Sequence, residues 1–157
     1  IYDLYYEQIF IFIIKRVGDE TTTAELTAEV FYKALYSIRK YKFQGLPFSS
    51  WLYRIASNNV TEYYRKQKKV QRHVSIDSDH LINLVSEVSD ESDFEKQQQL
   101  LLSMLNRLKE NEIQLIELRF FEERSFKYVG EILGLTENNA KVKTFRVIQK
   151  MRKIADR

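Results

Sequence analysis

The chain has only four glycines and one proline among its 157 residues, and this shortage of turn-forming residues constrains its fold more than any other feature. A protein of many short strands needs tight turns, and tight turns depend on glycine and proline. Helices joined by a few loops need far fewer of them. The hydrophobic share of 44% is ample for a packed core. We therefore predict an all-α fold.

Hydrophobic periodicity predicts three helices in a first domain of residues 1–69. We expect them over residues 2–17, 22–40 and 49–69. The second helix is expected to begin at a Thr22 or Thr23 cap, and the third at a Ser49 or Ser50 cap. The second helix carries a clean 3.6-residue stripe that should face the core: Leu26, Val30, Phe31, Ala34, Leu35 and Ile38.

Charge is distributed unevenly along the chain, although the net charge is only +3. Residues 1–69 hold 11 Lys/Arg against 7 Asp/Glu, residues 70–95 hold 1 against 7, and residues 96–157 hold 13 against 8. The stretch 70–93 is also rich in serine and poor in aliphatic residues, so we predict an acidic linker that is mostly extended or disordered.

The helical pattern returns in a second domain, residues 94–157. We expect helices over residues 94–107, 110–122, 126–133 and 137 to the end. Gly134 suits a left-handed helix end, Thr136 suits the cap of the next helix, and Gly130 permits a close crossing. A short helix that meets a long basic helix across such a turn is typical of a helix-turn-helix motif, whose second helix enters the major groove of DNA.

The last helix has one apolar face and one face suited to DNA. Asparagine and arginine read base edges, valine or phenylalanine meets a thymine methyl group, and lysines contact phosphates. The alternative is a packing hairpin with a solvated basic face, but it gives no reason for Val142 and Phe145 to face water. The residues that we expect to contact DNA are Asn138, Asn139, Lys141, Val142, Lys143, Phe145, Arg146 and Gln149.

The third helix has a comparable polar face. Arg54, Asn58, Thr61 and Arg65 recur at helical spacing, and the loop before them supplies Lys42, Phe43 and Phe48. Aromatic rings beside a basic stripe suit single-stranded nucleic acid, because bases stack on the rings and the backbone follows the charge. Aromatic residues at helical spacing are also common in cores, so this pattern alone leaves both interpretations open.

Nothing in the sequence indicates an enzyme, a metal site or a cofactor. The chain has no cysteine, no nucleophile elbow and no glycine-rich phosphate loop, and His73 and His80 lie in the predicted linker, where we expect them to be solvated. The longest apolar run, Ile9 to Ile14, is far shorter than the roughly 20 residues that span a bilayer. No signal peptide is recognisable, so we expect a cytoplasmic protein. The sequence begins at Ile1 rather than methionine, which leaves open whether residues precede it.

Three segments in this order resemble the extracytoplasmic-function (ECF) group of bacterial sigma factors, and the resemblance covers essentially the whole chain. Residues 24–31 are similar to an acidic helix of the family, residues 48–58 to its most recognisable motif, and residues 125–146 to its C-terminal helix-turn-helix. The chain differs from the usual family pattern at Glu25 and Ala28, and again at 138–140. These last differences imply an unusual DNA preference.

The resemblance implies a role for each surface. Glu25, Glu29 and Phe31 would dock on the clamp of the largest subunit of core RNA polymerase. Residues 42–48 and the polar face of the third helix would bind the minus-ten promoter element and hold a flipped base. The last helix would bind the minus-thirty-five element, and the acidic linker would thread the RNA exit channel. Many members of the group are held by an anti-sigma factor, so the resemblance implies such a partner. It also implies a location in the bacterial cytoplasm, with a tether to the membrane where the anti-sigma factor is a membrane protein.

Two other functions remain open at this point. The first is a stand-alone transcription regulator, in which the C-terminal domain binds DNA and residues 1–69 bind a ligand or a second copy. The second is an adaptor that binds polymerase or another protein and uses its basic faces only for electrostatic attraction. Tight sequence-specific DNA binding without polymerase would favour the regulator.

Overall fold

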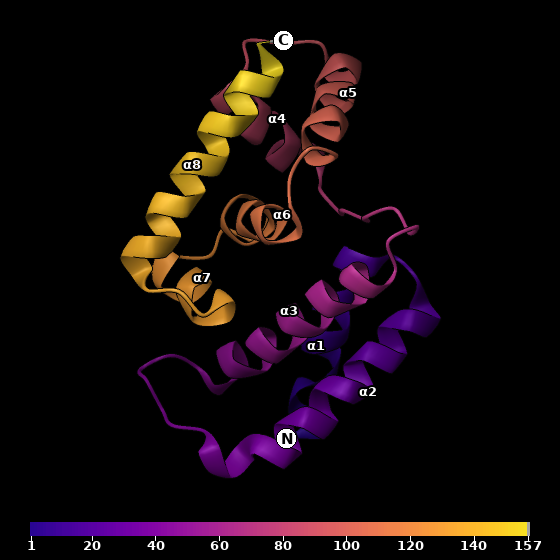
Figure 1. Cartoon of the computed structure of the whole chain (residues 1–157), viewed down its shortest axis with the longest axis vertical. Coiled ribbons are helices and arrows are strands. Elements are labelled where there is room, and N and C mark those ends of the chain that lie inside the picture. Colours follow the sequence, from indigo (N-terminus) through magenta and orange to yellow (C-terminus); the bar gives the residue numbers. More distant parts are fainter. Residues whose placement is uncertain (157) are drawn as a thin grey trace. The chain divides into compact units, whose positions relative to one another are not determined.

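The structure, a computed structural model, describes residues 1–156, and every regular element in that part of the chain is helical (Figure 1). The prediction of an all-α fold is confirmed. The chain divides into two compact units. One comprises Ile1–Ser75 together with Glu131–Gly134, and the other comprises Ile76–Gly130 and the residues from Leu135 onward. None of the described helices combines the length and the apolar character needed to cross a membrane.

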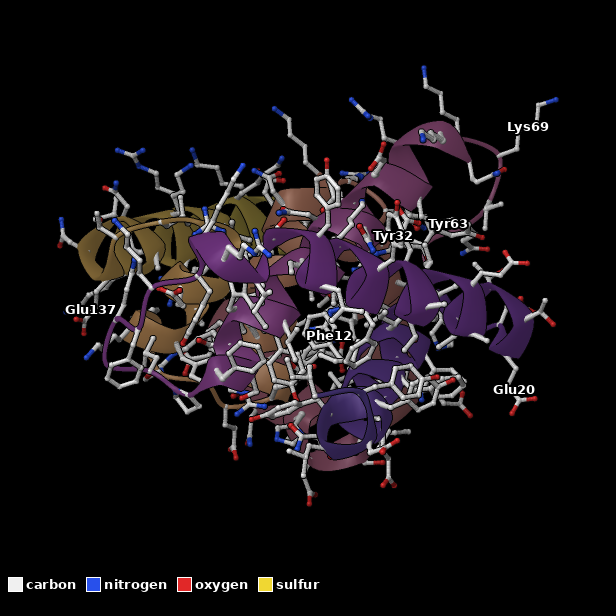
Figure 2. All side chains as sticks on the ribbon, turned by 90° about the horizontal axis from the view of Figure 1, so that it is seen from below. Phe12, Glu20, Tyr32, Tyr63, Lys69 and Glu137 are labelled. Atoms are coloured by element: carbon white, nitrogen blue, oxygen red, sulfur yellow. The ribbon has the colours of Figure 1, made fainter. Side chains whose placement is uncertain are left out.

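Three mutually packed helices form the N-terminal unit. They are α1 (Tyr2–Val17), α2 (Glu20–Ser37) and α3 (Phe48–Lys66), with the short 3-10 helix η1 (Ile38–Lys40) after α2. Phe12 of α1 lies in the middle of this unit (Figure 2), where its ring packs on Tyr53 at 4.9 Å between centroids. The guanidinium of buried Arg16 lies 3.5 Å from the same ring, which stabilises a charge inside the core.

The helix ends follow local chemistry, but two predicted caps are wrong. Helix α2 is capped by Asp19, not by Thr22 or Thr23, because the Asp19 carboxylate accepts the Thr22 N–H at 2.8 Å. This hydrogen bond lowers the pKa of the Asp19 carboxyl below its ordinary value of 3.8. Helix α3 begins after Pro47, and the Ser50 hydroxyl donates to the Pro47 carbonyl at 2.8 Å. The predicted Ser49 and Ser50 thus lie inside the first turn of α3.

The predicted apolar stripe of α2 is right for most positions and wrong for Leu35. Val30, Phe31 and Ala34 are buried, but Leu35 is 65% exposed. The buried face includes Thr23 and Thr27 instead, and the Thr27 hydroxyl donates to the Thr23 carbonyl at 2.7 Å. A threonine that bonds within its own helix can be buried at little cost.

The C-terminal unit is built on the remaining helices, except for the last residues of α7. They are α4 (Ser78–Val88), α5 (Phe94–Leu105), α6 (Glu110–Ile116), the π-helical turn η2 (Glu117–Phe121), α7 (Phe126–Leu133) and α8 (Glu137–Ala155). Its core is aliphatic with two methionines and includes Leu84, Met104, Leu118, Val129 and Met151. The four predicted helices match α5, α6 together with η2, α7 and α8 closely.

Helix α4 contradicts the prediction that residues 70–93 are mostly extended or disordered. Its Asp77 cap accepts the His80 N–H at 2.8 Å, and the aliphatic residues at helical spacing are buried against α5, α8 and η2. The His80 ring is half-buried and lies 2.7 Å from an Asp77 carboxylate oxygen, so it is not a freely solvated histidine. Acidic composition concealed an amphipathic helix that becomes stable only when it packs.

Candidate nucleic-acid interface

The helix-turn-helix in the C-terminal unit is built by three local devices. The Ser125 hydroxyl accepts the Tyr128 N–H at 3.2 Å and starts α7, while the Thr136 hydroxyl accepts the Asn139 N–H at 3.1 Å and starts α8. Gly134 has φ 71°, the left-handed conformation that ends a helix. These features agree with the predicted motif.

Gly130 fixes the angle at which the chain leaves α7. The Leu135 N–H donates to the Gly130 carbonyl at 2.7 Å. A Cβ on Gly130 would lie 2.5 Å from the Leu135 carbonyl oxygen, which is too close for any side chain. A glycine is therefore required inside this helix, as the predicted close crossing implies.

Helix α8 presents two distinct faces. Ala140, Thr144, Val147, Ile148 and Met151 are buried, as predicted. The predicted DNA-contacting residues are exposed except for half-buried Gln149: Asn138, Asn139, Lys141, Val142, Lys143, Phe145 and Arg146. This arrangement leaves amide, cationic and apolar groups together on the solvent side of one helix, which is the set of groups that reads a major groove.

A groove of about 560 Å³ runs beside the exposed face of α8. Phe120 and Phe126 line it together with Val142 and Phe145 of α8. Glu87 of α4 and Arg152 also line it. No local pattern predicts Phe120, Phe126 or Glu87 at this place, because they come from three different elements.

Helix α3 exposes the predicted polar face of the N-terminal unit. Arg54, Asn58, Thr61 and Arg65 are all exposed and share one side of the helix. Their neighbour Asn59 is buried and accepts from Lys33 at 2.6 Å. Asn58 is exposed and the adjacent Asn59 is buried, so the boundary between the core side and the solvent side of α3 falls between them.

The loop before α3 combines one exposed ring with a fixed aromatic base. Phe43 is 76% exposed, and Lys42 is exposed beside it. Phe48 is half-buried and packs against Tyr41 and Trp51, with centroids at 5.0 and 5.4 Å. Phe43 is thus free to stack on a base, whereas Phe48 braces the loop. The sequence prediction did not include Tyr41 or Trp51 in this cluster.

Helix α2 separates the three residues that the resemblance assigned to polymerase binding. Glu25 and Glu29 are exposed, and Glu29 pairs with Lys33 at 2.9 Å. Phe31 is only 4% exposed and packs against Tyr2 at 5.0 Å between ring centroids, so its assignment to a binding surface is wrong. Its position on the inner side of an amphipathic helix makes it part of the core.

An exposed apolar row on α2 was missed by the sequence prediction. Tyr32, Leu35 and Tyr36 are 71%, 65% and 83% exposed and follow one another at i, i+3 and i+4. Tyr32 is labelled in Figure 2. The signal was present in the sequence, since this spacing defines one helix face, but Leu35 was assigned to the wrong face. Large side chains held in water at helical spacing are typical of a docking surface.

Ion pairs between α2 and α3 set the charge around the N-terminal surfaces. Lys66 lies 3.1 Å from the Glu62 carboxylate and Lys33 lies 3.9 Å from it, and the Lys66 hydrogen bond is the main reason that the pKa of Glu62 is lowered. Arg65 lies 3.6 Å from the same carboxylate, so its charge is partly balanced. Within residues 1–156, no three acidic or histidine side chains gather as a metal site would require.

Comparison with known proteins matches both units to parts of one family. The family Sigma-70 region 2 matches residues 1–70, and Sigma-70, region 4 matches residues 104–153. The ECF RNA polymerase sigma factor BldN of Streptomyces coelicolor is 27% identical over 98% of this chain, which spans 58% of that protein. The ECF RNA polymerase sigma factor SigM of Bacillus subtilis is 26% identical over 100% of this chain and 94% of its own length.

A solved structure has a similar fold. The sigma factor RpoE of Bartonella quintana, solved in complex with the anti-sigma factor NepR, gives a TM-score of 0.58 at 15% identity, covering 99% of this chain and 94% of that chain. Two matched regions, in the order and over the segments that carry the helix-turn-helix and the polar face of α3, account for most of the chain. The chain therefore belongs to the sigma-70 family, within its ECF group.

Proposed function

We propose that this chain is an alternative sigma factor, which binds core RNA polymerase and directs it to a specific set of promoters. The observation that carries the proposal is the pair of exposed DNA-suited surfaces, one on α3 and one on α8, on two separate units of one sigma-family chain. The chain acts through binding energy alone. Synthesis of RNA belongs to the polymerase, so the chain itself is not an enzyme.

The N-terminal unit binds the minus-ten element in this proposal. Arg54, Asn58, Thr61 and Arg65 contact the single strand along α3, and Lys42 contacts the backbone near the loop. The exposed ring of Phe43 stacks on a base that leaves the helix, while Phe48 keeps the loop in place. Stacking on a rigidly supported loop stabilises the melted strand and thereby favours opening of the duplex.

The C-terminal unit binds the minus-thirty-five element through α8. Asn138 and Arg146 reach base edges, Val142 and Phe145 contact thymine methyl groups, and Lys141 contacts a phosphate. The remaining members of this surface are Asn139, Lys143 and Gln149. The amides and apolar groups favour A·T pairs over G·C pairs at the contacted positions.

Core polymerase docks on α2, and we place the clamp of its largest subunit on the exposed row Tyr32, Leu35 and Tyr36 beside Glu25 and Glu29. An apolar row flanked by acids suits a partner surface with apolar anchors and basic groups. We also propose an anti-sigma factor as a second partner, since the solved relative RpoE was captured with one. The site of action is the bacterial cytoplasm, and an anti-sigma factor in the membrane would tether the chain there.

Run-off transcription with core RNA polymerase and a pool of promoter fragments tests the proposal. We expect specific transcripts only when the chain is added. Asn138→Ala should change which promoters respond, whereas Ile82→Ser, on the outer face of α4, should not change the choice. If polymerase is not stimulated while the chain alone binds DNA sequence-specifically, a stand-alone regulator replaces the sigma factor. If the chain neither stimulates polymerase nor binds DNA sequence-specifically, an adaptor role replaces the sigma factor.

A further inference from the structure

We propose that residues 76–93, here called the acidic strap, are an autoinhibitory element. While the strap is docked on the C-terminal unit, the chain is too short to engage the minus-ten and minus-thirty-five elements of one promoter together. The strap leaves the unit when the chain binds both elements of a promoter. The inference rests on the proposed function. It concerns a segment for which sequence reasoning predicted an extended linker and in which the structure contains α4.

Several contacts fasten the docked strap to the C-terminal unit. Arg152 of α8 donates its Nε–H to the Glu87 carbonyl at 2.8 Å, and Gln97 of α5 donates its side-chain N–H to the Glu91 carbonyl at 2.8 Å. The apolar face of α4 is buried against α5, α8 and η2. That face consists of Leu81, Leu84, Val85 and Val88.

The segment before the strap is fastened to the N-terminal unit. The Tyr64 hydroxyl donates to the Arg16 carbonyl at 2.5 Å and accepts the His73 N–H at 3.2 Å. The His73 ring lies directly over Gly18, where a Cβ would come within 2.8 Å of it. With the strap docked, the tether from His73 to Ile76 is three residue steps, or about 10 Å when extended.

This tether is short compared with a promoter. Elements near minus ten and minus thirty-five lie about 25 base pairs apart, or about 85 Å at 3.4 Å per base pair. A compact unit of about 75 residues has a radius of gyration of about 11 Å and is about 30 Å across. Two units on the short tether reach only about 70 Å when fully stretched. After release, the tether from His73 to Asp93 alone reaches about 70 Å. With the width of one unit added, this length exceeds the distance of about 85 Å between the two promoter elements.

The docked strap also places negative charge beside the DNA-reading face. Glu87 lines the same groove as Asn138, Lys141 and Val142 of α8. The strap carries six Asp/Glu and no Lys/Arg. A carboxylate within about a Debye length of 8–10 Å repels the phosphates that Lys141 would attract. Docking thus lowers DNA affinity, and approaching DNA in turn favours release of the strap.

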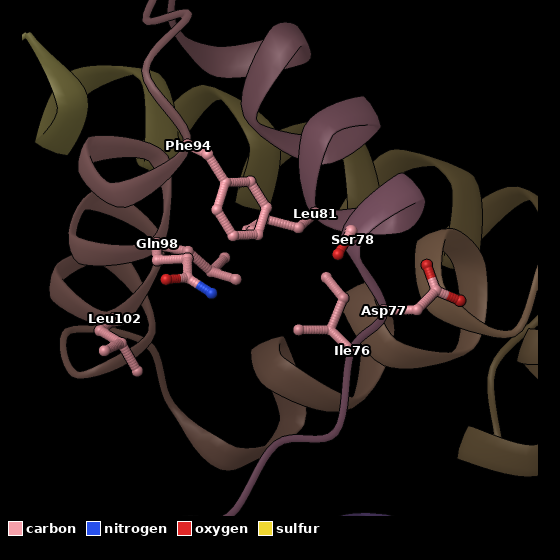
Figure 3. Close-up of a pocket in the computed structure, with 8 residues that line it drawn as sticks. Ile76, Asp77, Ser78, Leu81, Phe94, Gln98 and Leu102 are labelled. Atoms are coloured by element: carbon pink, nitrogen blue, oxygen red, sulfur yellow. The ribbon is translucent and has the colours of Figure 1, made fainter.

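The strap is suited to leave because α4 is a short helix of 11 residues. A pocket of about 270 Å³ lies between the start of α4 and α5 and is lined by Ile76, Leu81, Phe94 and Leu102 among others; several of these side chains are labelled in Figure 3. Phe94 and Leu102 are 41% and 57% exposed, so this hollow opens to solvent at the start of α4. An isolated helix shorter than about 12–15 residues is marginal in water, so a released strap becomes an extended tether.

Hydrogen–deuterium exchange on the full chain tests this inference directly. The backbone amides of α4 should be protected in the free chain. They should exchange on the order of tenfold faster or more when the chain is bound to core polymerase and a promoter found by the run-off assay. Protection of α4 that persists in a transcribing complex, or rapid exchange of α4 in the free chain, would overturn the inference.

Substitutions test the docking of the strap and the charge of the Glu87 carboxylate separately. Leu84→Ser with Val85→Ser should undock the strap, and Glu87→Gln should remove the carboxylate at the groove. Both variants should reach half-maximal transcription at a lower concentration of the chain, and the undocked variant at a concentration lower by on the order of tenfold. The reason is that a larger fraction of the chains has a released strap and can bind both promoter elements. Ile82→Ser is the matched control on the exposed face of α4 and should change nothing.

The outcomes also separate this inference from the proposed function. Transcription by the wild-type chain with no gain from either variant would overturn the strap while the sigma function stands. Failure of every variant to stimulate polymerase would overturn the proposed function, and the strap's role with it. Stronger transcription with both variants, together with loss of α4 amide protection on promoter binding, supports both the strap and the sigma function.

Discussion

At the scale of single residues, the structure depends on a few positions where backbone geometry or a single hydrogen bond decides the local fold. Gly130 and Asp19 are the clearest of these. One permits a turn that no side chain would fit, and the other supplies a charged cap that begins a helix. Each has a measurable consequence for stability.

Gly130→Ala should lower the free energy of unfolding by about 1–3 kcal/mol, because its Cβ would overlap the Leu135 carbonyl and force α7 away from the turn. Urea denaturation measures the change. Glu131→Ala, at a half-exposed position of the same helix, is the control and should stay within about 0.5 kcal/mol. Equal stability of both variants would contradict the close approach.

The Asp19 cap should contribute to stability in a pH-dependent way. Because the Thr22 N–H lowers the pKa of this carboxyl below 3.8, the ionised cap stabilises α2 at pH values above 3.8. The contribution is lost as the pH falls through the lower folded-state pKa. The difference in urea midpoint between wild type and Asp19→Ala should therefore be constant near neutral pH and shrink below pH 3.8. Asp19→Asn, which caps without titrating, should keep its advantage over alanine in acid.

At the scale of elements, the helices divide into those that only build cores and those that also expose a face that we propose for binding. Helices α2, α3 and α8 each carry large apolar or cationic groups on their exposed sides. Because these groups contribute little to folding, substitution there should separate binding from stability. Substitution of a buried neighbour on the same helix should not.

On α2, Leu35→Ser with Tyr36→Ser should weaken core polymerase binding on the order of tenfold or more without a loss of stability. Both side chains are exposed, and truncating them removes only the docking contacts. Leu4→Ser on α1, which is 74% exposed, is a matched control and should bind normally. Phe31→Ala should instead destabilise the fold by about 3–5 kcal/mol. Reduced binding of the Leu4 variant alone would place the docking surface on α1.

On α8, Asn138→Ala and Lys141→Ala should fail in different ways. Loss of Asn138 should relax preference at one base pair by about 1–3 kcal/mol, since an amide reads a base edge. Loss of Lys141 should weaken binding to all sequences and reduce the slope of log affinity against log salt by about 1. Binding of core polymerase with the chain to promoter variants over a salt series measures both. The same salt slope for the two variants would contradict these roles.

At the scale of the whole molecule, the chain has two compact units with separate cores rather than one. Thermal unfolding should therefore depart from two-state behaviour, with a calorimetric enthalpy larger than the van't Hoff enthalpy. Scanning calorimetry of the full chain tests this expectation. A single transition with equal enthalpies would mean that the units unfold cooperatively.

The sequence by itself determined the helical class, most helix positions, the helix-turn-helix and the exposed faces of α3 and α8. These features are local: caps, glycine turns and a 3.6-residue period act within a few residues and leave their pattern in the chain. The family resemblance rested on the same local motifs, and its match to two regions is confirmed.

Only tertiary structure decided the features that depend on a partner surface. Phe31 and Leu35 both fit the apolar pattern of α2, and packing alone buried one and exposed the other. Helix α4 is too short to be stable without α5 and α8, so its acidic sequence resembled a linker. Glu87 came to line the α8 groove for the same reason. Burial is a property of contacts between distant segments, and a single sequence does not record which segments meet.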